Sequence, residues 1–347
     1  MQHDEAGAHA AGCQSNGQAV VFTATGIMKN DSVIDVAVGV VMHTDGRVLL
    51  AERPPGKPSA GYWEFPGGKF EIGESPRQAL ARELHEELGV ELDAAYPWIT
   101  REYRYPDRSV RLHLYRVLSW HGEAHGREGQ QVSWQDPRAI NVAPLLPANH
   151  GIVQALNLPQ LYAITHAAKY GITDFMERLR LALDKGVRLI QVRERDRAPE
   201  QLTQFARRVV ALAHQYGAQV LVNGDESVAL RVGADGVHLQ AGQLMHCRGR
   251  PNTRLVGASC HNRGELLRAA ELGVDFVVLS PVLPTRSHPG APTLGWERFA
   301  ELCLDLPMPV FALGGMRLDM IETSMTHSAH GVALLSGIWN ECGSWPT

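Results

Sequence analysis

The sequence predicts an α/β protein with two folded domains, and two patterns along the chain indicate this class. Over residues 33–156, β-like stretches surround one strongly acidic helix, which is typical of a mixed sheet packed against a helix. From about residue 157 onward, short apolar runs alternate with helical patterns, which is typical of parallel strands joined by helices. A chain of 347 residues is long enough for both domains.

Composition excludes several classes of protein. Hydrophobic residues make up 44% of the chain, but no apolar run reaches membrane-spanning length, so we expect no membrane association. A net charge of -4 provides no broad basic field, so direct binding of duplex DNA is not expected. The five scattered cysteines lack Cys-x-x-Cys spacing, which argues against a disulfide framework or a zinc site and fits a cytoplasmic location.

The first 32 residues differ from the rest of the chain. They are rich in Ala, Gly, Gln and His, show no helical or strand periodicity, and lack the basic start and apolar core of a secretory signal. We therefore expect residues 1–32 to be a flexible extension, residues 33–156 to form the first domain and residues 157–347 to form the second.

Four strands are predicted in the first domain. Stretches at 33–41 and 48–51 lie on either side of Asp45-Gly46, a turn that favours a hairpin between them. Two further β-like stretches, 99–105 and 110–120, are joined by the turn residues 106–108.

A helix is predicted between these two pairs of strands. It begins at Ser75-Pro76, which is an N-cap residue followed by a first-turn proline, and it ends at Gly89. Just ahead of it, Gly67-Gly68 permit a tight turn and a close approach of the backbone to a phosphate or a metal.

This helix carries Glu83, Glu86 and Glu87 on one stripe. Side chains three and four positions apart point the same way, so the three carboxylates repel one another unless a positive charge lies between them. Mg²⁺ or Mn²⁺ meets that need, because both prefer oxygen ligands and Mg²⁺ commonly shares its ligands with substrate phosphates. The sequence therefore predicts a divalent metal site that serves diphosphate chemistry.

The spacing around the stripe is Gly68, five residues, Glu74, seven residues, and then Arg82-Glu83-Leu84-His85-Glu86-Glu87-Leu88-Gly89-Val90. This pattern resembles the Nudix box of the Nudix hydrolases, which cleave nucleoside diphosphates linked to another moiety. The resemblance implies an α/β/α sandwich with a mixed sheet for the first domain, and Mg²⁺ or Mn²⁺ as its cofactor.

Further motifs resemble the MutT subgroup, which hydrolyses 8-oxo-dGTP to 8-oxo-dGMP and pyrophosphate and so prevents mutation. They are residues 64–69, 105–108, 126–130 and 147–149. The resemblance implies that the metal is held and the chemistry supported by Glu83, Glu86, Glu87 and Glu128, with the Gly67 carbonyl as a further metal ligand. It implies that substrate is bound by Arg53, Phe65, Asp107, Arg108 and Asn149.

Asn149 has the most specific implied role. Its amide offers both a donor and an acceptor, as reading the 6-oxo and N7-H edge of the oxidised purine requires. A buried polar mismatch with guanine, whose N7 is an acceptor, costs about 1 to 3 kcal/mol.

Each implied role has a structural alternative. Asn149 could be a turn or cap residue, Arg53 and Arg108 exposed cations, Glu128 a solvated loop residue and Phe65 a core residue.

Eight apolar runs predict a (β/α)₈ TIM barrel for the second domain, at 161–165, 189–192, 220–223, 236–239, 255–259, 276–280, 310–313 and 331–335. Chemistry in such barrels lies at the carboxyl ends of the strands. The candidate phosphate or substrate residues at these ends are Gln191, Arg193, Arg195, Asn223, Ser259, His261, Thr285, Gly315 and Ser336.

This half resembles the thiamine-phosphate synthase and thiazole tautomerase family, through residues 191–195, 234–239, 257–261, 280–285 and 313–316. The resemblance implies that in the synthases two acidic residues hold Mg²⁺ for the departing pyrophosphate. This chain instead reads Asn223-Gly224-Asp225, where the acid is displaced by one residue, and residues 238–243, which contain no acid. Asp225 could shift into the metal position, but a displacement of one residue at a strand end changes where a side chain points. His288 stands in place of the synthases' lysine. We therefore expect the barrel to be degenerate for synthesis while it still binds a thiazole or thiamine phosphate.

Several functions stay open. The first is hydrolysis of the nucleoside triphosphate 8-oxo-dGTP, and the second is Nudix cleavage of another nucleotide or of a thiamine-related diphosphate. The barrel could add synthase or tautomerase activity, with His261 as a candidate acid or base for the latter. A non-catalytic barrel could instead act as a thiamine-phosphate sensor or as a scaffold.

Overall fold

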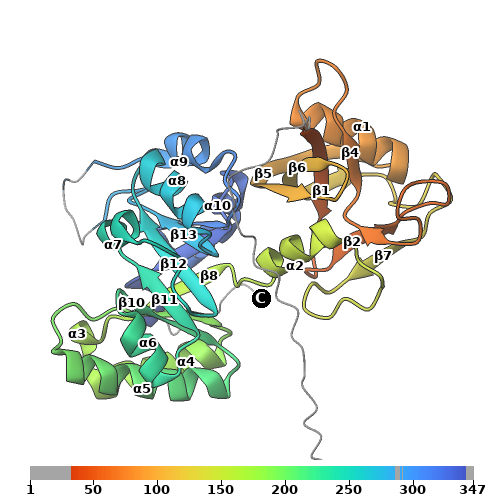
Figure 1. Cartoon of the computed structure of the whole chain (residues 1–347). Coiled ribbons are helices and arrows are strands. Elements are labelled where there is room, and N and C mark those ends of the chain that lie inside the picture. The colour runs from red at the N-terminus through yellow and green to blue at the C-terminus, as the bar shows by residue number, and fades with distance from the viewer. Residues whose placement is uncertain (1–32, 286–289, 291, 341–347) are drawn as a thin grey trace, which may run out of the picture. The chain divides into compact units, whose positions relative to one another are not determined.

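A computed structural model describes residues 33–285, 290 and 292–340 (Figure 1). The expected flexible extension at 1–32 and His288 lie outside these residues. The first domain contains two sheets, one ordered β4-β1-β6-β5 and one ordered β3-β2-β7. Their strands are β1 (Ile34–Val41), β2 (Val48–Glu52), β3 (Trp63–Glu64), β4 (Gly67–Lys69), β5 (Glu91–Arg104), β6 (Ser109–His121) and β7 (Val132–Gln135).

The larger sheet is mixed, as predicted. Its strands β1 and β6 are parallel, whereas β1 with β4 and β5 with β6 are antiparallel. Strand β5 begins at Glu91, well before the predicted start at residue 99.

The predicted hairpin between the first two strands is wrong beyond its turn. The turn itself forms, since the His43 amide donates to the Arg47 carbonyl at 2.8 Å. Only one bridge follows, between Met42 and Val48, and then β1 and β2 join different sheets. Each strand finds its main partners far along the chain, and a local turn signal cannot reveal such pairing.

Helices cover both faces of the larger sheet. Helix α1 (Pro76–Leu88) packs through Leu80, Leu84 and Leu88 against one face, and α2 (His150–Leu156) packs through Ile152 against the other. Strand β1 alternates between them, with Ala37 in the core under α1 and Val38 in the core under α2. This is the expected α/β/α sandwich.

The second domain is a closed barrel of eight parallel strands, as predicted. The strands are β8 (Leu161–Ile164), β9 (Leu189–Val192), β10 (Gln219–Asn223), β11 (Gly236–Leu239), β12 (Leu255–Cys260), β13 (Phe276–Leu279), β14 (Val310–Ala312) and β15 (Gly331–Leu334). The helices around it are α3 (Ala167–Tyr170), α4 (Ile172–Asp184), α5 (Pro199–Gln215), α6 (Glu226–Val232), α7 (Ala241–His246), α8 (Arg263–Leu272), α9 (Gly295–Cys303), α10 (Ile321–Thr326) and α11 (Gly337–Asn340).

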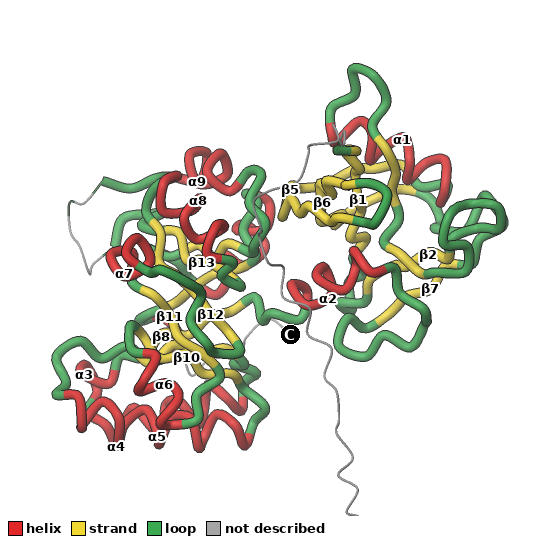
Figure 2. Tube along the Cα trace, viewed as in Figure 1, coloured by secondary structure: helices red, strands yellow, loops and turns green. Residues whose placement is uncertain are grey.

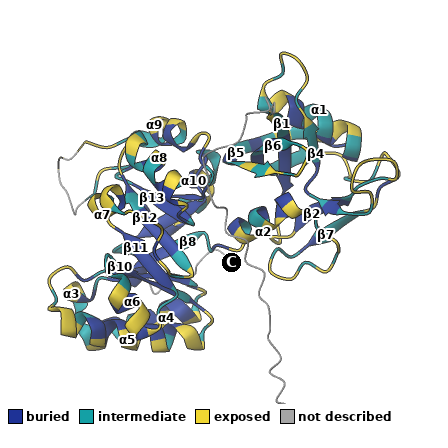
Figure 3. Cartoon of the chain, viewed as in Figure 1, coloured by how far each residue is buried: buried dark blue, intermediate teal, exposed yellow. Residues whose placement is uncertain are grey.

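Helices alternate with strands along this domain (Figure 2). The barrel strands are buried and the helices expose their outer faces (Figure 3). Two short 3₁₀ helices, η1 (Pro147–Asn149) and η2 (Leu318–Met320), complete the elements. No helix in the described ranges is long and apolar enough to span a bilayer.

Candidate active site

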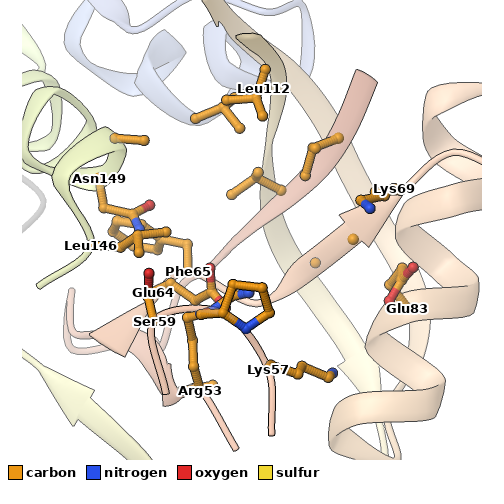
Figure 4. A pocket seen from close by; sticks show the side chains of 18 of the residues that line it. Arg53, Lys57, Ser59, Glu64, Phe65, Lys69, Glu83, Leu112, Leu146 and Asn149 are labelled. Carbon is orange, nitrogen blue, oxygen red and sulfur yellow. The ribbon is translucent and has the colours of Figure 1, made fainter. Parts of the chain in front are cut away.

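A pocket of about 480 Å³ lies in the first domain, a size that suits a small ligand. Asn149 and Phe65 lie at one end, and Glu83 and Lys69 at the other (Figure 4). Of the residues predicted for this site, those that line the pocket are Arg53, Phe65, Gly67, Glu83, Glu87, Arg108 and Asn149. The pocket lining does not include Glu86, Asp107 or Glu128.

Helix α1 is held in place at both ends, as the sequence predicts. Ser75 and Gln78 form a capping box, Pro76 occupies the first turn, and Gly89 closes the helix in the left-handed conformation. Because its apolar side chains are fixed in the core, the acidic face of the helix points to the pocket.

Gly68 lets β4 approach this acidic face closely. A Cβ atom on Gly68 would lie 2.1 Å from the carboxyl carbon of Glu83, so any larger residue would collide with that carboxylate. The Glu83 carboxylate thus lies directly against the backbone of β4, in the place that a side chain of residue 68 would take.

Arg82 is one of two basic residues in the described part of the first domain that pair with the carboxylates of the site. Its guanidinium donates to Glu74 at 2.8 Å, Glu83 at 2.9 Å and Glu86 at 3.2 Å. The Glu74 partner raises the pKa of Arg82, so the guanidinium stays charged. The inference that a positive charge must lie among these carboxylates therefore holds, but an arginine that sequence reasoning missed supplies part of it, and Glu86 is half exposed outside the pocket.

Glu87 is largely buried, with its side chain 16% exposed, the same fraction as for Glu83. Burial raises its pKa to about 7, although the Gly67 amide, which donates to it at 3.3 Å, acts in the opposite direction. A desolvated carboxylate with so little compensation gains from a nearby cation.

Glu128 lies in a loop that is fixed to the last turn of α1. The Arg127 amide and the Gln130 side chain both donate to the Glu87 carbonyl, at 3.0 and 2.9 Å. Glu128 itself pairs with Lys57 at 2.5 Å, and the same ammonium lies 3.8 Å from Glu87. Sequence reasoning missed Lys57, because a single lysine in a proline-rich loop gives no recognisable signal.

The four predicted carboxylates do not converge as the side chains stand. Within residues 33–285, 290 and 292–340, no cluster of three or more His, Cys, Asp or Glu side chains is close enough to hold a metal ion. The donors nonetheless fit Mg²⁺ or Mn²⁺, because they are all oxygens, Glu83 and Glu87 line the same pocket, and burial raises the pKa of Glu87.

The other end of the pocket contains Phe65, Leu146 and Asn149 (Figure 4). Phe65 is 2% exposed, belongs to the core under α2 and also lines the pocket, so its position agrees with both the core role and the predicted substrate contact. Asn149 is 4% exposed, and its side chain makes no capping hydrogen bond to α2. Asn149 therefore stands at the N-cap position of α2 without its side chain serving as a cap.

Two predicted cations line the pocket but are paired within the chain. Arg53 donates to Glu64 at 2.5 Å and to the Pro58 carbonyl at 2.7 Å, while burial raises the pKa of Glu64. Arg108 donates to Asp107 at 2.8 Å, and Asp107 is 68% exposed outside the pocket lining. Asp107 thus adjoins the pocket as the partner of Arg108.

A second pocket, of about 1360 Å³, lies at the carboxyl ends of the barrel strands. It is lined by all nine predicted barrel residues, namely Gln191, Arg193, Arg195, Asn223, Ser259, His261, Thr285, Gly315 and Ser336. The barrel topology explains this convergence, because the ends of parallel strands meet on one rim.

Neutral hydrogen bonds join the side chains across this rim. The side-chain amide of Gln240 donates to the side chain of Asn223 at 3.1 Å, and that of Asn223 donates to Gln191 at 3.3 Å. The side-chain amide of Gln191 donates to the Tyr162 hydroxyl at 3.1 Å. Tyr162 in turn contacts His238 at 3.2 Å. Burial lowers the pKa of His238 to about 3, so every group in this chain of hydrogen bonds is neutral.

Gly224 and Gln243 occupy the region where synthases carry acids. Gly224 has a left-handed φ of 76°, and a Cβ atom there would lie 2.9 Å from the Gln240 amide nitrogen. Gln243 donates to the Gly224 carbonyl at 2.7 Å. Asp225 instead caps α6, accepting from the Val228 amide at 2.9 Å, so it does not take the metal position.

Both domains of the chain are similar to known protein families. Residues 161–338 match the family described as thiamine monophosphate synthase, and residues 33–156 match the NUDIX domain. The barrel half is 39% identical to a "putative thiamine-phosphate synthase 2" of Aquifex aeolicus, over 52% of this chain and 98% of that protein.

Two relatives match the first half. An 8-oxo-dGTP diphosphatase of Haemophilus influenzae is 37% identical over 36% of this chain and 91% of its own length. A CTP pyrophosphohydrolase of Escherichia coli is 39% identical over 34% of this chain and 87% of its own length. The first half is thus similar to hydrolases with different nucleotide substrates.

Proposed function

The chain belongs to the thiamine monophosphate synthase family through its barrel and carries a NUDIX domain ahead of it, and from this premise we propose that the NUDIX domain is a Mg²⁺-dependent diphosphatase that converts 8-oxo-dGTP to 8-oxo-dGMP and pyrophosphate. The observation that carries the proposal is a single pocket with Asn149 at one end and the carboxylates of α1 at the other. A nucleoside triphosphate has its base and its phosphates at opposite ends in the same way.

The phosphate end would hold the metal through Glu83, Glu87 and Glu128. A bound divalent ion supplies charge neutralisation for the phosphates and acidifies a water molecule. Glu87 would give up its proton on metal binding, since its raised pKa leaves it partly protonated near neutral pH. Arg82 would keep Glu83 in place against the backbone of Gly68.

The base end would select the oxidised purine. The carboxamide oxygen of Asn149 would accept from the N7-H of 8-oxoguanine, whereas guanine presents a lone pair there. Because Asn149 is buried and is not used as a helix cap, water compensates poorly for a mismatch, which costs about 1 to 3 kcal/mol. Arg108, beside Tyr105 at 5.0 Å, would cover the base from the rim.

A pyrimidine triphosphate is the second candidate substrate, because the CTP pyrophosphohydrolase is as similar to this domain as the 8-oxo-dGTP diphosphatase is. A panel of 8-oxo-dGTP, dGTP, CTP, dCTP and thiamine diphosphate with Mg²⁺ separates these substrates on the intact chain. The proposal requires the highest kcat/KM for 8-oxo-dGTP. A higher value for CTP would replace the substrate assignment while keeping the reaction.

The barrel is proposed to bind a thiazole or thiamine phosphate without synthase activity. Its rim offers Arg193, Ser259 and Ser336 to a phosphate, but amides and a glycine stand where metal-binding acids would be needed. Calorimetry with thiazole phosphate would show heat of binding. Thiamine phosphate formed from the pyrimidine diphosphate, thiazole phosphate and Mg²⁺ would overturn the loss of synthase activity.

A further inference from the structure

Lys57 links the loop between β2 and β3 to the carboxylates of the NUDIX site. Its ammonium lies 2.5 Å from Glu128 and 3.8 Å from Glu87. These are two of the three carboxylates assigned above to the divalent ion, so the lysine and the ion compete for the same oxygen atoms. The lysine side chain also lines the pocket and extends toward the α1 end of it (Figure 4).

The loop holds Lys57 at its tip without fixing the ammonium. Arg53 fastens the base of the loop, because its amide donates to the Tyr62 carbonyl at 2.7 Å and its guanidinium to the Pro58 carbonyl at 2.7 Å. Residues 55–60 between these points are exposed. A lysine on such a loop has a flexible four-carbon stem, so its ammonium can move several ångströms while the backbone stays in place.

We propose that Lys57 is a mobile counter-ion that holds Glu128 and Glu87 until a divalent ion displaces it, and that its ammonium then binds the phosphates of the substrate. This inference rests on the metal-dependent diphosphatase activity proposed above. The ammonium and a divalent ion repel each other at one pair of carboxylates, so the binding of either one weakens the binding of the other. Substrate phosphates at the same end of the pocket are the nearest new anionic partners.

The roles of Lys57 and Arg82 differ in consequence. Arg82 is 22% exposed and is anchored by Glu74 and by the Lys69 carbonyl, so it stays with the helix. Lys57 is 43% exposed and is the counter-ion that can leave. The site thereby avoids bare carboxylates before metal entry and adds a phosphate ligand after it.

The displacement of Lys57 by a divalent ion is tested by Mn²⁺ binding to the intact, chelator-stripped chain without nucleotide. Binding is followed by the loss of the free-ion signal in electron paramagnetic resonance. Lys57→Met should bind Mn²⁺ about two- to fivefold more tightly than wild type, the range expected for an exposed ion pair. Arg47→Met is the matched control, because it removes one exposed cation of the same domain that pairs only with an exposed turn residue, Asp45. Unchanged or weaker Mn²⁺ binding in Lys57→Met would overturn the inference.

Steady-state kinetics test whether the Lys57 ammonium binds the phosphates of the substrate. Lys57→Met should raise KM for the best nucleoside triphosphate about fivefold with little change in kcat, and Lys57→Arg should restore most of the loss. An unchanged KM would overturn the transfer to phosphate. Because Mn²⁺ binding is measured without nucleotide, a failure of the 8-oxo-dGTP assignment leaves the displacement result interpretable, and the two failures are distinguishable.

Discussion

The two pockets of this chain differ in the charge of the side chains at their proposed ligand sites. In the NUDIX pocket, carboxylates lie at the proposed phosphate end and are balanced by Arg82 and Lys57. At the barrel rim, the side-chain amides of Asn223, Gln191 and Gln240 form a neutral chain of hydrogen bonds. On the proposed functions, the first pocket needs added positive charge to bind its anionic substrate, and the second does not.

The difference explains why one half fits metal chemistry and the other fits metal-free binding. A carboxylate cluster is stable only with cations in contact, so a divalent ion can replace an internal one at small cost. Neutral amides satisfy one another and attract no divalent ion strongly enough to expel its water. The following predictions can break or sharpen this contrast.

Removal of a carboxylate should have the largest effect. Glu83→Gln or Glu87→Gln should lower kcat by about 10³-fold while the fold survives, because each loses a negative ligand for the ion that stabilises the phosphates. Pyrophosphate release measures the rate, and a thermal unfolding transition shows whether each variant is folded. Glu91→Gln, at the exposed start of β5, is the matched control. Turnover near wild type in both site variants would contradict the metal assignment.

Metal affinity of the NUDIX site should depend strongly on pH. The pKa of Glu87 is raised to about 7, so the carboxyl must lose a proton before it can bind a cation. Affinity for Mn²⁺ should therefore rise about tenfold per pH unit from pH 5 to 7 and level off above. A flat profile over this range would show that Glu87 is not a ligand.

The stability of the chelated chain should change in the opposite sense. Because the folded-state pKa of Glu87 lies above its ordinary value, the folded state binds more protons between about pH 4.5 and 7, and the Glu87 contribution to the free energy of unfolding falls as pH rises through this window.

Asn149→Ala should erase substrate preference with a smaller effect. We expect the ratio of kcat/KM for 8-oxo-dGTP over dGTP to fall by about 30-fold, which corresponds to one buried polar mismatch. The exposed Asn141→Ala variant controls for loss of an asparagine in the same domain. If the ratio in Asn149→Ala stays at the wild-type value, the base is read elsewhere.

Chelation should leave the barrel nearly unaffected. The affinity of the intact chain for thiazole phosphate should change by less than about twofold when EDTA replaces Mg²⁺, because neutral side-chain amides stand where metal-binding acids would be needed. Calorimetry in both buffers gives the comparison. A large loss of affinity with EDTA would mean that the barrel still binds its ligand through a metal.

Much of this organisation could be predicted from the sequence. The caps of α1 are local signals, and the nine barrel residues meet because the topology of a closed barrel brings strand ends together. The separation of β1 from β2 could not be predicted, since it depends on distant strand partners. The counter-ions Arg82 and Lys57 and the role of Asp225 as a cap also needed coordinates, because their partners depend on side-chain direction rather than on spacing.

The most direct test of the central claim is pyrophosphate release from 8-oxo-dGTP by the chelator-stripped intact chain, followed by ³¹P nuclear magnetic resonance before and after Mg²⁺ is added. The account predicts no cleavage before the addition, and 8-oxo-dGMP with pyrophosphate in equal amounts after it. Cleavage at the same rate without Mg²⁺, or no cleavage of any nucleotide with it, would contradict a carboxylate site built for a divalent ion.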